Sequence, residues 1–245
     1  MPFTPAHAAI VLPFLRVNPR RLSATGLVVG SLAPDFEYFL KMTVNSTHSH
    51  TVAGLFYFDL PVTLLLSILF HRIAKINLIH ALPTFVAARF FDTLSLNFLE
   101  VLKKYPLAFC LSAILGSFSH VLWDSFTHGD GFFVTLLGYK YGYYIPFDGV
   151  RYPLWYAFQH ISTVAGLALI VAYIFFKRRL PGFSNASINR LAYWATVVTI
   201  MVVVAGLRFL LKPYDFEIGN VVVSGIAGFL VGIVAAGRLN FETRR

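Results

Sequence analysis

The sequence predicts an all-α protein, a multi-pass transmembrane helical bundle of about five spans with short interfacial helices. Composition is the first reason: 57% of the 245 residues are hydrophobic and 13% are charged, and the mean hydropathy is +0.70. Soluble domains rarely have this balance. The second reason is that apolar runs near the roughly 20 residues of a membrane-crossing helix recur along the chain.

The predicted spans follow these apolar runs in order. They are Ala53 to Phe70, Pro106 to Phe126, Pro153 to Phe176, Leu191 to Leu211 and Ile218 to Gly237. No internal repeat or low-complexity tract is visible, so we expect one membrane domain over residues 1–245. Within it, residues 1–52 form an N-terminal polar segment, 53–176 the core spans that carry the site, and 177–245 the C-terminal spans.

The segment between the first two predicted spans has two interpretations. Leu82 to Leu102 is apolar but is interrupted by Arg89, Asp92 and Glu100, which favours an amphipathic helix on the membrane surface. A sixth span there is the alternative.

The formal charge of +9 indicates topology rather than nucleic-acid binding, because lysines and arginines gather at the ends of the predicted spans. Residues 177–190 hold basic residues and no acid, so we expect this segment in the cytoplasm. Alternation then places the N-terminal segment and residues 127–152 on the non-cytoplasmic side. The basic residues Arg16, Arg20, Arg21 and Lys41 run against that orientation.

The sharpest candidate for chemistry lies in the second predicted span, in GSFSHVLWDSFTHGDG. His120, Asp124 and His128 follow at intervals of four and therefore share one helical face. Ionisable groups in a membrane span are costly, so each is a functional candidate. The alternative is that Asp124 accepts a hydrogen bond from a histidine and only locks helices together.

Two further polar motifs precede the first predicted span. His48 and His50 alternate in THSHT, and Asp35 and Glu37 flank Phe36 after Pro34. Imidazole and carboxylate are the usual ligands of zinc and, with more oxygen, of manganese or iron. A metal-bound water that loses its proton attacks acyl or phosphoryl centres, with Glu37 or another acid such as Asp124 moving the proton. The sequence has no Walker loop, dinucleotide glycine fingerprint, GxSxG elbow or CxxC pair.

Several motifs resemble an uncharacterised family of integral membrane proteins, domain of unknown function 4184. They are MPFTPAHAAIVLP, GSLAPDFEYFL, HTVAGLFYFDLP, SHVLWDSFTHGDG and FQHISTVAGL. That family is similar to bacterial membrane-bound metal-dependent hydrolases. The resemblance implies the metal ligands His7, Asp35, His50 or His48, His120 and Asp124. The sequence departs from the hydrolase pattern at Glu37, where PDxD has its second aspartate, and at THSH, a reduced form of HRGxTHS.

Three more polar residues are candidates. Gln159 and His160 belong to the FQHISTVAGL motif, and an interhelical hydrogen bond is their other interpretation. Arg208, near the end of the fourth predicted span, either holds a phosphate or extends its charge to the interface, which we favour.

The sequence therefore suggests a membrane-embedded hydrolase that depends on a divalent metal, with zinc favoured. Its substrate is expected to be a lipid or phosphoester, and its partner the membrane lipid rather than nucleic acid. The site is expected on the non-cytoplasmic side. The alternative is a non-enzymatic membrane protein, a transporter or assembly factor, whose His and Asp residues serve packing or proton transfer.

Overall fold

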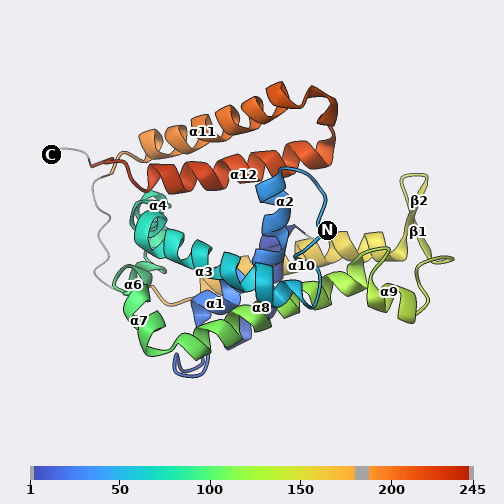
Figure 1. Cartoon of the computed structure of the whole chain (residues 1–245), viewed down its shortest axis with the longest axis horizontal. Coiled ribbons are helices and arrows are strands. Elements are labelled where there is room, and N and C mark those ends of the chain that lie inside the picture. Colours follow the sequence, from blue (N-terminus) through green and yellow to red (C-terminus); the bar gives the residue numbers. More distant parts are fainter. Residues whose placement is uncertain (1–2, 180–187, 243–245) are drawn as a thin grey trace. The chain divides into compact units, whose positions relative to one another are not determined.

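The computed structural model describes residues 3–179 and 188–242, whose regular secondary structure is helical apart from one short hairpin and an isolated β-bridge (Figure 1). Five of the described helical segments are long and apolar enough to cross a membrane: Leu55–Ala81, Pro106–Leu136, Leu154–Phe176, Arg190–Leu211 and Ile218–Ala236. The predicted fold class and the five predicted spans are confirmed. Arg244, Arg245 and most of the basic segment 177–190 lie outside the described residues.

The first span differs most from its prediction, since it ends at Ala81 instead of Phe70. It begins with a π-helical turn (Leu55–Asp59), continues as α3 (Leu60–Leu69), and passes through a second π-helical turn (Phe70–Ala74) into α4 (Lys75–Ala81). The helix therefore continues past the His71 and Arg72 side chains. The hydropathy pattern predicted that this helix ends before its first basic residues, whereas it continues to Ala81.

The segment after Ala81 forms neither a single amphipathic helix nor a sixth span. It folds into three short helices, α5 (Thr84–Ala87), α6 (Phe91–Leu94) and α7 (Phe98–Lys104). Pro83 has no backbone N–H and disfavours a helical conformation in the residue before it, so α4 ends and α5 starts there. Both interpretations of residues 82–102, a single amphipathic helix and a sixth span, were therefore wrong.

The chain divides into two compact units. The first unit comprises residues 1–35, 48–63 and 105–176, and the second comprises residues 36–47, 64–104 and 177–245.

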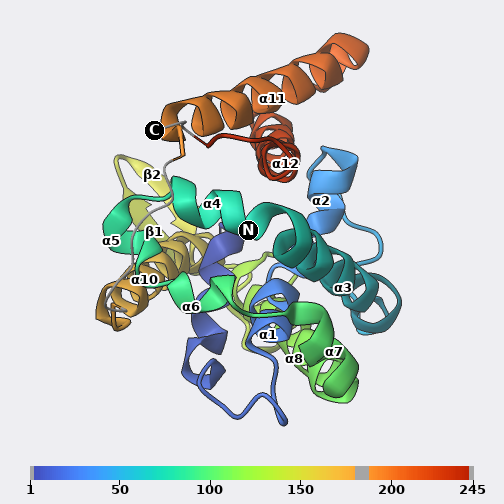
Figure 2. The same cartoon turned by 90° about the vertical axis from the view of Figure 1, so that its left-hand side faces the viewer.

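In the first unit, a seam of small residues joins α1 (Ala24–Gly30) to α8 (Pro106–Thr127), which lie side by side in both views (Figures 1 and 2). A methyl group on Gly30 would collide with the backbone of Ala113, and one on Gly116 would collide with the backbone of Leu27. The Ser117 hydroxyl donates to the carbonyl of Gly30 at 3.0 Å. Such seams allow close helix approach in membranes, where apolar surface gives little driving force between helices.

Two other segments complete the first unit. The 3-10 helix Thr4–Phe14 packs against α10 (Leu154–Phe176), where Gly166 lies against Ala6. After α8, the short helix α9 (Phe132–Leu136) leads to an antiparallel hairpin of β1 (Tyr144–Phe147) and β2 (Val150–Pro153), which runs directly into α10.

The second unit is built on the antiparallel pair α11 (Arg190–Leu211) and α12 (Ile218–Ala236), which lie side by side in Figure 1. Gly228 and Gly232 lie against the backbone of Met201 and Val197, so this contact also depends on small residues. The unit also contains α2 (Phe36–Lys41) and a 3-10 turn at Pro213–Asp215.

Candidate metal centre

Four segments of the first unit bring five ionisable side chains together. The 3-10 helix Thr4–Phe14 and the turn Ala33–Asp35 contribute one residue each, the loop before Leu55 contributes one, and α8 contributes two. Within this set, two triads have potential ligand atoms that all lie within 4.8 Å of one another. The five residues are His7, Asp35, His50, His120 and Asp124.

Distances between these side chains match a metal cage better than a hydrogen-bonded network. The Nε2 atom of His120 lies 3.4 Å from Asp35 Oδ1 and 3.3 Å from Asp124 Oδ2. The Nε2 atom of His50 lies 3.6 and 3.5 Å from the same two oxygens. A hydrogen bond between imidazolium and carboxylate is about 2.7–2.9 Å long. Ligands about 2.0–2.1 Å from a tetrahedral zinc ion are about 3.3–3.4 Å from each other.

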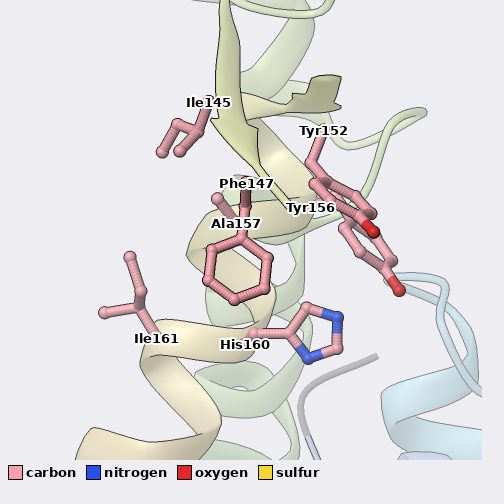
Figure 3. Close-up of a pocket in the computed structure, with 7 residues that line it drawn as sticks. All are labelled: Ile145, Phe147, Tyr152, Tyr156, Ala157, His160 and Ile161. Atoms are coloured by element: carbon pink, nitrogen blue, oxygen red, sulfur yellow. The ribbon is translucent and has the colours of Figure 1, made fainter. Parts of the chain in front are cut away.

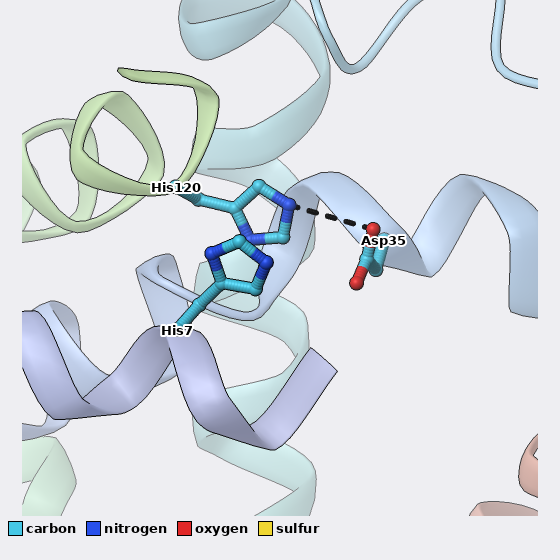
Figure 4. Close-up of side chains that lie close together, drawn as sticks. All are labelled: His7, Asp35 and His120. Atoms are coloured by element: carbon cyan, nitrogen blue, oxygen red, sulfur yellow. Dashed lines mark ion pairs between the residues drawn. The ribbon is translucent and has the colours of Figure 1, made fainter. Parts of the chain in front are cut away.

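His7 completes the cluster on its inner side. Its ring stacks on that of His120 with centroids 3.7 Å apart, and its Nε2 lies 3.4 Å from Asp124 Oδ1. Figure 4 shows the two rings beside the Asp35 carboxylate. Within the described part of the chain, neither nitrogen of His7 has a hydrogen-bond partner, although the residue is only 1% exposed. Buried polar atoms without partners are rare, and a bound cation would satisfy one.

Hydrogen bonds outside the cluster orient its ligand atoms. His120 Nδ1–H donates to the carbonyl of Ser31 at 2.8 Å, which leaves the Nε2 lone pair facing the carboxylates. The Thr4 hydroxyl donates to Asp35 Oδ2 at 2.5 Å, which leaves Oδ1 for the cluster. Sequence reasoning missed Thr4 and Ser31, and the only signal for Thr4 was its position one helical turn before His7.

Burial and neighbouring charges set the charge states of the cluster residues outside the spans. Burial, together with repulsion from His120, lowers the pKa of His7 to about 3, so its imidazole is neutral near pH 7. Burial alone would raise the pKa of Asp35, but the charge and hydrogen bonding of His120, with a contribution from His50, hold it below its usual range. Burial lowers the pKa of His50, and the neighbouring carboxylates of Asp124 and Asp35 more than compensate, so the pKa is raised.

Two other predicted ligands lie beside the cluster or outside it. His128 follows the last residue of α8, and its Nδ1 lies 3.0 Å from the backbone carbonyl of Asp124 and 3.6 Å from that residue's Oδ1. His48 is exposed, and its Nδ1 lies 3.0 Å from the Tyr57 hydroxyl. Of the alternating histidines in THSHT, the structure therefore brings His50 to the cluster.

Glu37 and Arg208 belong to the second unit. One oxygen of Glu37 accepts hydrogen bonds from Lys41 Nζ, at 2.5 Å, and from the backbone and hydroxyl of Thr47. Arg208 is buried and donates to two backbone carbonyls and to Asp215, at 2.8 Å from the carboxylate. These contacts are typical of groups that tie local segments together. A proton-transfer role for Glu37 and a phosphate-binding role for Arg208 stay predictions.

Gln159 and His160 lie on adjacent positions of α10 in the first unit. Gln159 is buried, whereas His160 is exposed and packs edge-on against the ring of Tyr156, with centroids 4.5 Å apart. His160 lines an aromatic groove, described below. The His160 ring therefore contacts Tyr156 of the same helix.

The cluster therefore offers three imidazoles and two carboxylates, a donor set that fits zinc and other borderline divalent ions and contains no thiolate.

Comparison with known proteins adds a family but no activity. No curated protein and no solved structure matches the chain. The model of one family matches residues 1–237, nearly the whole sequence, so the chain belongs to the family described as Domain of unknown function (DUF4184).

Proposed function

We propose that this protein is a membrane-embedded, metal-dependent hydrolase that acts on a lipid ester or phosphoester, with zinc as its resident metal. The observation that carries the proposal is the spacing of the ligand atoms. Four distances of 3.3–3.6 Å join the Nε2 atoms of His50 and His120 to one oxygen each of Asp35 and Asp124. They correspond to edges of about the length expected around tetrahedral zinc.

The protein's own groups would divide the work. His50, His120, Asp35 and Asp124 would hold the ion, and His7 would supply a further neutral nitrogen. A zinc ion in such a site lowers the pKa of bound water to about 7 and polarises a carbonyl or phosphoryl oxygen. His50 has the most accessible side chain of this set, 20% exposed, so we propose that substrate approaches from its side.

The position of the cluster favours a substrate from the membrane. His120 and Asp124 lie on a helix long and apolar enough to cross the bilayer, and His50 lies just before another such helix. Asp124 lies three residues before the end of α8 and His50 five residues before the first span, so we propose that this side of the cluster faces the lipid head groups, with His120 one turn deeper. By alternation of the spans we place this site on the non-cytoplasmic side.

Metal analysis of the purified protein tests the proposal first. Protein purified in detergent without chelator should contain about one equivalent of zinc or another divalent ion. It should hydrolyse a chromogenic ester or phosphoester, lose this activity with a chelator, and regain it with zinc. A metal-free wild type that also fails to bind added zinc would overturn the proposal. It would favour the non-enzymatic interpretation, in which the cluster serves packing or a proton path.

A further inference from the structure

A groove of about 510 Å³ lies between the β1–β2 hairpin and the first turns of α10. This volume is in the range of small-molecule sites, about 300–1,000 Å³. Its walls are apolar and aromatic, with a single imidazole, and Figure 3 shows the rings of Tyr152 and Tyr156 beside one another. Ile145 and Phe147 come from the hairpin, and His160 from α10.

Chain connectivity places this groove at the membrane surface. The hairpin joins the end of one membrane-crossing segment, at Leu136, to the start of another, at Leu154. A short connection between consecutive spans has to stay at one face of the bilayer. The floor of the groove, formed by Tyr156, His160 and Ile161, belongs to the first turns of that second span, where head groups meet hydrocarbon.

The hairpin suits lipid better than water. Every residue from 141 to 150 is exposed, and these include four aromatic residues, among them Phe147 at 72%. An isolated two-stranded hairpin is marginally stable in water, and tyrosines gather at membrane interfaces. Lys140 precedes the hairpin and Arg151 lies in β2, and their positive charge matches lipid phosphates.

The helix that forms the floor of the groove also contacts the end of α8, the helix that carries two cluster residues. The Trp155 ring packs over Gly129, where an added methyl carbon would lie 3.0 Å from it. Gly129 follows His128, which contacts Asp124. Trp155 precedes Tyr156 of the groove, so the first turn of α10 packs against the segment that follows α8.

We infer that the groove holds an acyl chain of a membrane phospholipid. This contact stands on the groove and hairpin alone. Its consequence, that the hydrolysed substrate is an acyl-chain lipid, rests on the proposed function.

Lipid retention tests the inference. Protein in mild detergent is incubated with dioleoyl phosphatidylglycerol, and native mass spectrometry counts the lipids retained. We expect one tightly retained lipid on the wild type. Ala157→Trp, which fills the groove, should lower retention about tenfold or more. Ala168→Trp is the matched control, because it lies exposed three turns further along α10. Full retention by Ala157→Trp, or none by the wild type, would overturn the inference.

Two further measurements keep folding and function apart. Phe147→Ser changes only an exposed hairpin side chain, and it should also lower retention while the metal content and melting temperature stay at wild-type values. Both groove variants should slow hydrolysis of a phospholipid more than hydrolysis of a short, water-soluble ester, whereas Ala168→Trp should slow neither. A wild type that retains lipid but contains and binds no metal would refute the hydrolase and leave the groove assignment standing.

Discussion

Asp124 is the side chain whose replacement tests the candidate metal centre most directly, because both of its oxygens face imidazoles. Oδ1 lies 3.4 Å from His7 Nε2, and Oδ2 lies 3.3 and 3.5 Å from the Nε2 atoms of His120 and His50. Asp124→Asn preserves the shape, but its NH2 group has to replace one of the oxygens. An NH2 group donates hydrogen bonds and has no lone pair for a metal.

The expected loss can be worked out from the ligand set. Zinc sites with four ligands contribute about 10–16 kcal/mol, so one ligand accounts for about 3 kcal/mol, or about a hundredfold in Kd. At a zinc concentration 1,000 times the wild-type Kd, the ion adds about 4.1 kcal/mol to the free energy of unfolding. The same concentration is about ten times the Kd of the variant, so the ion then adds only about 1.4 kcal/mol.

Two measurements check this expectation. Competition with a chromogenic zinc chelator gives the Kd, and the melting temperature with and without zinc gives the stabilisation. Comparing each variant with its own metal-free form removes any effect of the substitution on the metal-free protein. Asp130→Asn is the matched control, because Asp130 is exposed beyond the end of α8. Zinc affinity of Asp124→Asn at the wild-type level would refute the assignment of Asp124 as a ligand.

Three other changes probe the surroundings of the cluster. Thr4→Val removes the hydroxyl that orients a carboxylate and should weaken zinc binding about 10- to 100-fold, whereas Thr4→Ser should restore it; equal titrations for both would contradict the orienting role. His50 has its pKa lowered by burial but raised more by two carboxylates, so zinc must displace its proton. Affinity should therefore rise with pH above the ordinary histidine pKa of about 6.5, and calorimetry in buffers of different ionisation heat should detect protons released; a pH-independent affinity would argue against this ligand. Gly30→Ala would push a methyl group into the Ala113 backbone and should lower both melting temperature and zinc content, whereas Gly225→Ala, which meets open space, should lower neither.

Hydropathy predicted most of the fold because the bilayer imposes helix length. The predicted limits of the last three spans agree with the structure within a residue. Hydropathy failed between α4 and α7. There, Pro83 and several short polar turns divide an apolar segment into pieces too short for a 20-residue average to detect. The division of the chain at residues 53 and 177 stays a prediction.

Helix geometry predicted the part of the candidate cluster that lies on α8, whereas the family resemblance was needed for His7, Asp35 and His50, because spacing alone cannot bring distant segments together. Four residues advance a helix by 400°, so each step in the series from His120 to Asp124 to His128 turns about 40° away from the starting face. After one step Asp124 still faces the cluster. After two steps His128 has turned toward the edge of the cluster, where α8 also ends. Ser31 became a partner of His120 only because the α1–α8 seam brings its carbonyl to the ring.

The small-residue seam also helps to explain how the ligands of the cluster come together. Its ligand atoms come from chain segments separated by up to about a hundred residues, so bringing them together costs loop-closure entropy. Here glycine packing between α1 and α8 brings the segments together, and the hydrogen bonds of Thr4 and Ser31 orient the ligands. Packing of this kind offsets part of the loop-closure entropy, whereas small zinc domains depend on metal binding for their folding. Donors that packing holds in place are the arrangement that electrostatic catalysis requires.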